Sequence, residues 1–306
     1  MKKDLITIKE LSVEEIEDIF SLATDVKKNK EKFNNSLEGK TLALIFQKPS
    51  NRTRVSFEVG IWELGGQAIY LGQDIKLGER EATKDVAMTL SRYVSAVVLR
   101  TFSHENILEF ARYASIPVIN GLSDFSHPCQ ALSDLFTIKE KFGKIKGLNL
   151  AYVGDGNNVC NSLLYASAKT GINLNIATPK KFEPQREVFD EAKRISLTAS
   201  NAKISLTNKP EEAVKDADII YTDVWASMGK EKEAKQRIKA FKNFQINRDL
   251  VSLAKKSHVI MHCLPAHRNQ EITDEIIDGS NSIVFDQAEN RLHVQKAILI
   301  KLLGEK

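Results

Sequence analysis

Cysteine, long apolar runs and net charge are all scarce in this sequence, and each shortage excludes a class of protein. Three cysteines (Cys129, Cys160, Cys263) occur among 306 residues, with no CxxC pair. Cysteines that are so few, and odd in number, provide no disulfide framework. They indicate a cytoplasmic protein with reduced thiols. The longest apolar runs, such as 41–46 and 297–303, are far too short to cross a bilayer, so we expect no membrane association.

The net charge is small as well. The chain carries 44 basic and 40 acidic residues, a surplus of +4, and this surplus by itself indicates neither nucleic acid nor another polyanion as a partner. The first residues, Met-Lys-Lys-Asp-Leu-Ile-Thr, show neither the apolar core nor the cleavage site of an export signal. With 42% hydrophobic and 27% charged residues, the composition is that of an ordinary globular protein, which we expect in the cytoplasm.

Apolar segments and helical patterns alternate along the chain, as in parallel α/β folds. A capping box at 12–15 (Ser-Val-Glu-Glu) predicts the start of the first helix. Strands are expected at 41–46, 69–71, 96–99, 117–119, 148–153, 173–177, 203–206, 218–222, 257–261 and 282–285. Further helices are expected at 53–64, 83–93, 104–114, 128–142 and 286–304.

Two successive series of strands and helices predict two doubly wound parallel-sheet domains of similar size, linked by helices. The length agrees with this, since a domain averages roughly 150 residues. Two lysine-rich stretches, 27–32 and 230–242, are interpreted as solvated helix faces.

Polar side chains gather where several predicted strands end, which is where open α/β sheets bind ligands. The first group, 48–54 (Lys-Pro-Ser-Asn-Arg-Thr-Arg), follows the strand 41–46 and opens a helix. Free N–H groups and the positive end of a helix attract an anion, and two arginines and two hydroxyls suit phosphate. The alternative is an ordinary Ser-capped helix with exposed arginines.

The second group is 127–130 (His-Pro-Cys-Gln), at the start of a helix. His127 and Gln130 share one face, so both could reach a carbonyl oxygen, and the helix N-terminus favours a neutral histidine. Arg100, at the end of the strand 96–99, could join the same pocket. A histidine that only caps the helix is the alternative.

The third group, 153–158 (Val-Gly-Asp-Gly-Asn-Asn), occupies the place of a dinucleotide fingerprint but lacks its third glycine, because Val159 stands there. We therefore expect no NAD. The fourth group combines Asp223 with His262, Cys263 and His267. Their spacing matches no common zinc site, and no evident base or oxyanion motif supports a thiol nucleophile. We expect neither a metal nor a cofactor.

Together these segments resemble the transcarbamylases, and among them the ornithine carbamoyltransferases most closely. The family motifs Ser-x-Arg-Thr-Arg, His-Pro-Cys-Gln, Asp-x-Trp-x-Ser-Met-Gly and His-Cys-Leu-Pro stand at 50–54, 127–130, 223–229 and 262–265. The segment 285–291 resembles the C-terminal signature of the family. The likeness runs in matching order from about residue 5 to the end of the chain.

The resemblance implies which residues bind each substrate and which take part in catalysis. The residues implied in carbamoyl-phosphate binding are Ser50, Asn51, Arg52, Thr53, Arg54, Lys76, Arg100, His127, Gln130, Cys263, Leu264 and Arg291. Those implied in ornithine binding are Asn158, Asp223, Ser227 and Met228. Those implied in catalysis are Arg100, His127, Asp223 and Cys263.

The same resemblance implies that the first domain, 1–135, binds carbamoyl phosphate and that the C-terminal helix, 290–306, packs back on it. The second domain, 150–285, would bind ornithine. A homotrimer with active sites at the subunit interfaces is also implied. Two positions depart from the family pattern: Asn51 replaces the usual threonine, and Lys76, expected to reach a neighbouring subunit's phosphate, replaces a glutamine.

The implied reaction is transfer of the carbamoyl group to the δ-amine of L-ornithine, giving citrulline and phosphate, in arginine biosynthesis. A carbamoyltransferase acting on aspartate, putrescine or N-acylornithine is the nearest alternative. An aspartate enzyme would need basic residues near 226–228, where Ala-Ser-Met stands. A dinucleotide-binding or regulatory module without catalysis is the alternative from another class.

Overall fold

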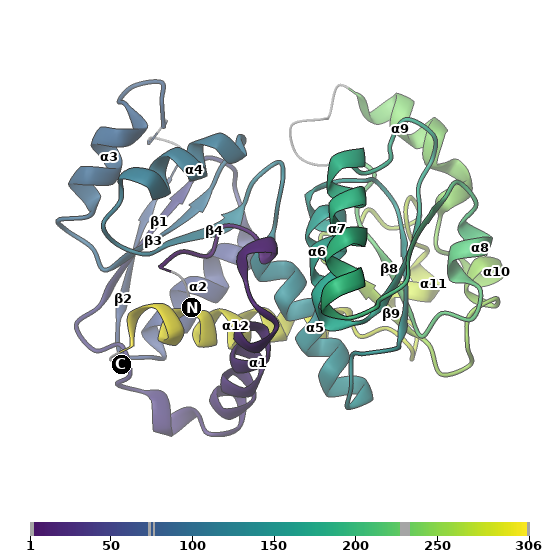
Figure 1. Ribbon diagram of the computed structural model, residues 1–306, viewed down its shortest axis with the longest axis horizontal. Coiled ribbons are helices and arrows are strands. Elements are labelled where there is room, and N and C mark those ends of the chain that lie inside the picture. Colours follow the sequence, from purple (N-terminus) through teal and green to yellow (C-terminus); the bar gives the residue numbers. More distant parts are fainter. Residues whose placement is uncertain (1–2, 73–74, 76, 227–232, 305–306) are drawn as a thin grey trace. The chain divides into compact units, whose positions relative to one another are not determined.

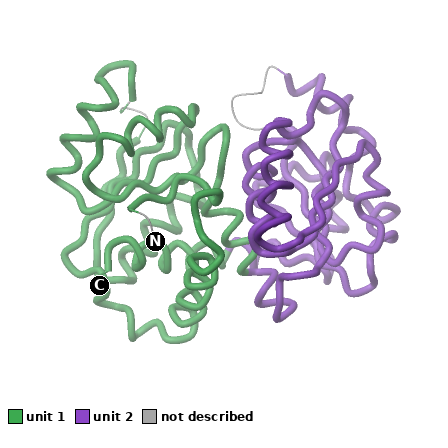
Figure 2. The backbone as a smooth tube through the Cα atoms, viewed as in Figure 1, with its two compact units in different colours: residues 1–136, 289–306 green, residues 137–288 purple. Residues whose placement is uncertain are grey.

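The structure, a computed structural model, describes residues 3–72, 75, 77–226 and 233–304. The predicted site residues Lys76, Ser227 and Met228 lie outside the described residues. The chain forms two compact units, drawn in green and purple in Figure 2. Unit 1 consists of residues 1–136 and 289–306, and unit 2 consists of residues 137–288.

Unit 1 is built on a parallel sheet of four strands in the order β2-β1-β3-β4 among the described residues. Its strands are β1 (Thr41–Phe46), β2 (Gln67–Leu71), β3 (Ala96–Arg100) and β4 (Val118–Leu122). Its helices are η1 (Ile8–Glu10), α1 (Val13–Lys28), η2 (Lys30–Phe33), α2 (Asn51–Trp62), α3 (Thr83–Leu90) and α4 (His104–Tyr113). The helices α5 (Pro128–Phe142) and α12 (Val284–Leu303) cross the boundary between the units.

Alternate residues of the unit 1 strands serve the two faces of the sheet. Ala43 and Ile45 of β1 pack with Phe110 of α4 and Val86 of α3 in one buried cluster. Figure 1 shows α3 and α4 over this face, and α1, α2 and the yellow α12 over the other. Covered on both faces, the central strands β1 and β3 are nearly continuous apolar runs, as the sequence predicts.

Unit 2 is built on a parallel sheet of five strands in the order β7-β6-β5-β8-β9 among the described residues. Its strands are β5 (Asn149–Val153), β6 (Asn173–Ala177), β7 (Ile204–Thr207), β8 (Ile219–Thr222) and β9 (Val259–His262). Its helices are α6 (Asn158–Thr170), α7 (Arg186–Ala199), α8 (Pro210–Val214), α9 (Ala234–Phe241), η4 (Lys242–Phe244), α10 (Arg248–Val251) and α11 (Asp274–Ile277).

One face of the unit 2 sheet packs on α8 to α11, where Val153, Ile220 and Ile260 of three strands meet Phe241 and Val214 in a buried cluster. Figure 1 shows α6 and α7 over the opposite face. Because all strands of each unit are parallel, their carboxyl ends share one edge, and the turns after β5, β8 and β9 lie together there.

The predicted fold class is confirmed: both units are parallel α/β structures, and α12 returns to unit 1. The capping box is confirmed too, since Ser12 Oγ accepts from Glu15 N at 3.1 Å and Glu15 Oε2 accepts from Ser12 N at 2.8 Å. The strand predicted at 282–285 is wrong. Ser282 forms only an isolated bridge with Ile260, and α12 begins at Val284, because so short an apolar run fits either structure.

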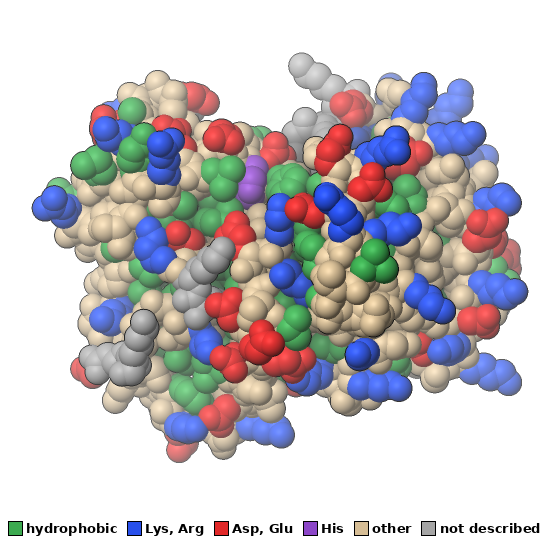
Figure 3. All heavy atoms as spheres, viewed as in Figure 1, with side chains coloured by type: hydrophobic (Ala, Val, Ile, Leu, Met, Phe, Trp, Pro, Cys, Tyr) green, Lys and Arg blue, Asp and Glu red, His purple; other side chains and the backbone are tan. Residues whose placement is uncertain are grey.

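The interpretation of 230–242 as a solvated face is also wrong for part of that stretch. Arg237 of α9 is buried, and its guanidinium pairs with Asp155 at 2.9 Å. Elsewhere charged side chains are mostly at the surface, and on the face drawn in Figure 3 the two signs are interspersed. Among the described residues, every helix is too short or too polar to span a bilayer.

Candidate functional site

The N-terminus of α2 presents the first predicted group. Ser50 is its N-cap, and Ser50 Oγ accepts from Thr53 N at 3.2 Å. Thr53 is buried, whereas Asn51 is exposed at the first helical position. The early N–H groups of a helix have no carbonyl partner within it, so this turn can hold an anion.

The side chain of Arg54 is partly exposed, whereas that of Thr53 is buried. Its Nε donates to Glu58 Oε1 at 2.9 Å, and its guanidinium lies 3.6 Å from the centre of the Tyr70 ring. The side chain is 41% exposed. The structure therefore places Arg54 at the surface of α2, bound to a carboxylate that a phosphate would have to replace or share.

A buried cluster of polar side chains brings together the ends of three helices of unit 1. Arg291 of α12 donates from Nη1 to Gln130 Oε1 at 2.6 Å and from Nη2 to Thr53 Oγ1 at 3.1 Å. Gln130 in turn donates to Asp134 at 2.8 Å. Predicted residues from three distant segments thus form one hydrogen-bonded group, and all of them are buried.

The cluster concentrates positive charge away from water. Arg100, 6% exposed, ends β3, and its Nε has no hydrogen-bond partner among the described residues. Burial, with the nearby charges of Arg291 and Arg52, lowers the pKa of Arg100 to about 10. A buried donor without a partner is costly, so this geometry suits an incoming anion or carbonyl oxygen.

The same surroundings keep His127 neutral. Burial, followed by the charges of Arg291, Arg100 and Arg52, holds the pKa of His127 well below its usual value. A neutral imidazole can donate one hydrogen bond without adding to the positive charge. Burial also raises the pKa of the neighbouring Cys129 thiol to about 12, so Cys129 stays protonated and inert.

Unit 2 has its own polar cluster around Asp223, which follows β8 and is 6% exposed. Asp223 Oδ1 accepts from Cys263 Sγ at 3.0 Å and from Val224 N at 2.8 Å. Asp223 Oδ2 accepts from Asn157 Nδ2 at 2.7 Å. The predicted pair of Asp223 and Cys263 is therefore in contact, and the predicted residue Asn158, which follows Asn157 in the chain, begins α6.

The loop after β9 is supported by a buried pair, His262 and Glu271, and neither residue is among the predicted site residues. His262 Nδ1 accepts from Leu264 N at 2.8 Å, so Nε2 carries the hydrogen and donates to Glu271 Oε1 at 3.1 Å. Leu264 has a left-handed φ of +54°, and the Leu264-Pro265 bond is cis. Only the proximity of Glu271 in space, nine residues along the chain, reveals this support.

The metal hypothesis fits this geometry poorly. Ligand atoms of Asp223, His262 and Cys263 lie within 4.8 Å of one another. However, both His262 nitrogens, the Cys263 thiol and both Asp223 oxygens already take part in hydrogen bonds. A metal would have to displace these partners, so the arrangement favours a hydrogen-bonded network.

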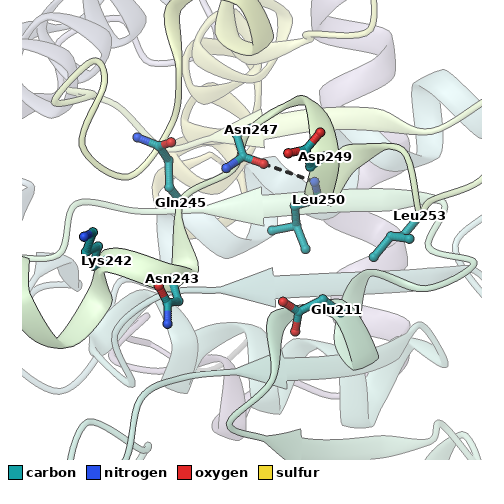
Figure 4. A pocket seen from close by; sticks show the side chains of 8 residues that line it. All are labelled: Glu211, Lys242, Asn243, Gln245, Asn247, Asp249, Leu250 and Leu253. Atoms are coloured by element: carbon teal, nitrogen blue, oxygen red, sulfur yellow. Dashed lines mark hydrogen bonds between the residues drawn. The ribbon is translucent and has the colours of Figure 1, made fainter.

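A cavity of about 410 Å³ opens elsewhere on unit 2 (Figure 4). Its lining consists of Glu211, Lys242, Asn243, Gln245, Asn247, Asp249, Leu250 and Leu253. None of the predicted site residues that the structure describes is in this lining. Most of its polar side chains are exposed, and Asn247 is engaged as the cap of α10. We therefore assign it no part in the chemistry.

Family models match both parts of the chain. The aspartate/ornithine carbamoyltransferase carbamoyl-P binding domain matches residues 3–140, and the Asp/Orn binding domain of the same family matches residues 146–302. The ornithine carbamoyltransferase of Thermococcus kodakarensis is 53% identical over 305 residues, which cover 99% of this chain and 96% of that protein.

Solved structures agree with the sequence matches. Ornithine carbamoyltransferase from Pyrococcus furiosus has a TM-score of 0.96 at 52% identity, covering 99% of this chain and 98% of that one. The anabolic ornithine carbamoyltransferase from Campylobacter jejuni has a TM-score of 0.93 at 42% identity, covering 98% of each chain. The chain is thus similar to these proteins along nearly its whole length.

Phosphate should stabilise unit 1, because Arg100 lies beside the charges of Arg52 and Arg291. Inorganic phosphate at about a hundred times its dissociation constant should add about 2.7 kcal/mol to the free energy of unfolding. We expect a higher thermal midpoint in sodium phosphate than in sodium chloride of equal ionic strength. The gain should be smaller in Arg100→Met, which removes one of the clustered charges, and equal midpoints of the unsubstituted protein in the two salts would contradict an anion site here.

Proposed function

The chain belongs to the aspartate/ornithine carbamoyltransferase family, and from this we propose that it transfers the carbamoyl group of carbamoyl phosphate to the δ-amine of L-ornithine. The products are L-citrulline and phosphate. One observation carries the proposal: unit 1 buries a cluster of arginine side chains, and unit 2 buries the carboxylate of Asp223, which accepts a hydrogen bond from the Cys263 thiol. The names of the similar proteins support ornithine as the acceptor.

We propose that the phosphate group binds at the start of α2, to Ser50, Asn51, Arg52, Thr53 and Arg54. Main-chain N–H groups and hydroxyls at a helix N-terminus, with guanidinium groups beside them, suit a phosphate dianion. Asn51 keeps a hydrogen-bonding side chain and a main-chain N–H at the position that is usually threonine. Lys76 of a neighbouring subunit is a further proposed contact, for which the resemblance is the support.

The carbamoyl oxygen would be bound by Thr53, Arg100, His127 and Gln130, with Arg291 beside them. Negative charge grows on this oxygen when the amine attacks, and each well-placed donor is typically worth about 3–4 kcal/mol. The buried Arg100, whose Nε has no hydrogen-bond partner among the described residues, and the neutral His127 support this role. The main chain at Cys263 and Leu264 is a further proposed contact of the carbamoyl group, for which the resemblance is the support.

Ornithine would be bound by Asn158, Asp223, Ser227 and Met228, with its δ-amine directed towards Asp223 and Cys263. A free amine of this kind has a pKa of about 10.4, so it must lose a proton before it attacks. Binding and orientation supply much of the rate. Once the new C–N bond has formed, the nitrogen gives up a second proton, which the departing phosphate can take as the C–O bond breaks. Cys263 Sγ donates a hydrogen bond to Asp223, and this contact supports a role in orienting the amine over covalent catalysis.

Another acceptor amine is the nearest alternative, because the family includes aspartate enzymes. Aspartate brings a second carboxylate that needs a basic partner. The described segment after β8 reads Asp223, Val224, Trp225 and Ala226 and supplies no such partner. This favours ornithine over aspartate, while putrescine and N-acylornithine remain to be tested.

An acceptor panel tests the reaction directly. Purified protein with carbamoyl phosphate should form citrulline from L-ornithine, with a kcat/KM at least about a hundredfold above those for putrescine, N-acetylornithine and aspartate, since a missing or extra polar group costs several kcal/mol. Release of inorganic phosphate should match carbamoyl product one to one. A different preferred amine would replace the proposed substrate, and no product with any amine would remove the transferase assignment.

The two substrates should depend on different residues. Replacing Arg54 by alanine should raise the KM for carbamoyl phosphate by about 10- to 100-fold, the usual worth of a hydrogen bond to a charged group. The KM for ornithine should stay within about twofold. The matched control is Arg186→Ala, which removes a surface arginine from a similar i,i+4 ion pair in unit 2. An unchanged KM for carbamoyl phosphate in Arg54→Ala would exclude Arg54 from the phosphate site.

We further propose a homotrimer. Val55, Val59 and Trp62 lie at helical spacing on α2 and are exposed, Trp62 by 74%. Ile69 of the edge strand β2 is exposed as well. Exposed apolar groups gathered on one helix face and a sheet edge are typical of an interface. They support contact between copies through unit 1.

Substitution at this face tests the assembly. Trp62→Glu should lower the molecular mass measured by sedimentation equilibrium from that of three chains to that of one, because burial of the new charge costs more than the contact gains. Leu197→Glu in unit 2, at an equally exposed apolar residue (74%), is the control and should remain trimeric. A single-chain mass for the unsubstituted protein would contradict the trimer.

The cellular role is proposed as arginine biosynthesis in the cytoplasm. The C. jejuni relative is named anabolic, which supports the biosynthetic direction. The three cysteines, all within the described residues, keep their thiols, which supports a reducing compartment.

A further inference from the structure

The side-chain amide of Asn157 contacts Asp223, although the sequence motifs single out only its neighbour Asn158. Asn157 lies in the turn between β5 and α6, and Asp223 directly follows β8, the parallel neighbour of β5. Asn157 Nδ2 donates to Asp223 Oδ2 at 2.7 Å. The amide therefore links the carboxyl ends of two adjacent strands through the carboxylate.

The orientation of this amide is fixed by a second task. Asn157 is the N-cap of α6, and its Oδ1 accepts from Val159 N at 3.0 Å and from Cys160 N at 3.1 Å. The Tyr152 hydroxyl lies 3.3 Å from the same oxygen. Because these donors require the oxygen on their side, the NH2 group must face Asp223.

The carboxylate of Asp223 is then held from both sides. Its other oxygen, Oδ1, accepts from Val224 N and from Cys263 Sγ. The side chain is almost completely buried, where an anion requires such donors. A carboxylate bound through both oxygens cannot rotate freely, so it presents a fixed direction to an ammonium group.

We propose that Asn157 is a positioning residue for ornithine, which acts by orienting Asp223 and does not itself contact the substrate. The inference rests on the proposed function, because it assigns Asp223 to the amine substrate. Without the Asn157 donor, Asp223 loses its bond at Oδ2 and turns more freely. Binding of ornithine should weaken, whereas binding of carbamoyl phosphate, assigned mainly to unit 1 residues, should change much less.

Two variants separate this role from the helix cap. Aspartate and serine are N-caps about as good as asparagine, so Asn157→Asp and Asn157→Ser should both keep the start of α6. Asn157→Asp places a second carboxylate against Asp223, and Asn157→Ser only removes the donor. The matched control is Asn247→Asp: Asn247 caps α10 by accepting from Leu250 N at 3.1 Å, as Figure 4 shows.

The readouts are the KM values for both substrates and the thermal midpoint. In Asn157→Asp the KM for ornithine should rise by about 10- to 100-fold, the worth of a hydrogen bond to a charged group together with like-charge repulsion. The rise should be smaller in Asn157→Ser. The KM for carbamoyl phosphate should change much less, and the thermal midpoint should match that of Asn247→Asp.

Other results overturn the inference. An unchanged KM for ornithine in both Asn157 variants would show that Asp223 needs no such donor. A parallel rise in both KM values, or a thermal midpoint lowered in both variants but not in the control, would make Asn157 a structural residue only. Failure of the unsubstituted protein to form citrulline from ornithine is a separate result: it would remove the proposed function and the inference with it.

Discussion

The anion-binding side of unit 1 depends on the hydrogen bonds of the Arg291 guanidinium group. It donates to Thr53 of α2 and to Gln130 of α5, and its Nε donates to Gln295 of its own helix. Arg291 and Thr53 are 238 residues apart in the chain. Since a buried cation must have acceptors, these bonds fix the C-terminal helix against unit 1 and bring the predicted residues together.

The arginines of this cluster repel one another, and a neutral histidine adds a donor without adding to that repulsion. Arg100 lies close to Arg291 and Arg52, so each further charge would cost more. His127, in the same surroundings, has its pKa lowered and stays neutral while keeping a donor. The result is a set of donors already oriented for an oxygen anion, which is the form of preorganisation that stabilises a developing negative charge.

Unit 2 positions its chemistry with hydrogen bonds. Asp223 is held by Asn157 and Cys263, and the loop that carries Cys263 is held by His262 and Glu271. The donors that Asn157, Val224 and Cys263 direct at this carboxylate are neutral, so they do not compensate its negative charge, and an ammonium group can do so. The thiol fits this pattern as a donor, which gives Cys263 a role that needs no covalent intermediate.

The fold class, most strand positions, the capped start of the first helix and the motif segments can all be predicted without the structure. These depend on local patterns: continuous apolar runs at β1 and β3, the capping box at Ser12, and Pro128 at the start of a helix. At 282–285 the local pattern is ambiguous: it predicts a strand, but α12 begins at Val284.

Which side chains come into contact is known only from the folded structure. Arg237, within a stretch rich in exposed charges, is buried against Asp155. Arg54 of the phosphate motif binds Glu58 at the surface, whereas Thr53 beside it joins the buried cluster. Asn157 reaches Asp223 across 66 residues of chain. Contacts between distant segments, such as that of Asn157 with Asp223, arise because parallel strands bring distant turns to one sheet edge, and no local pattern shows which side chains then come within hydrogen-bond distance.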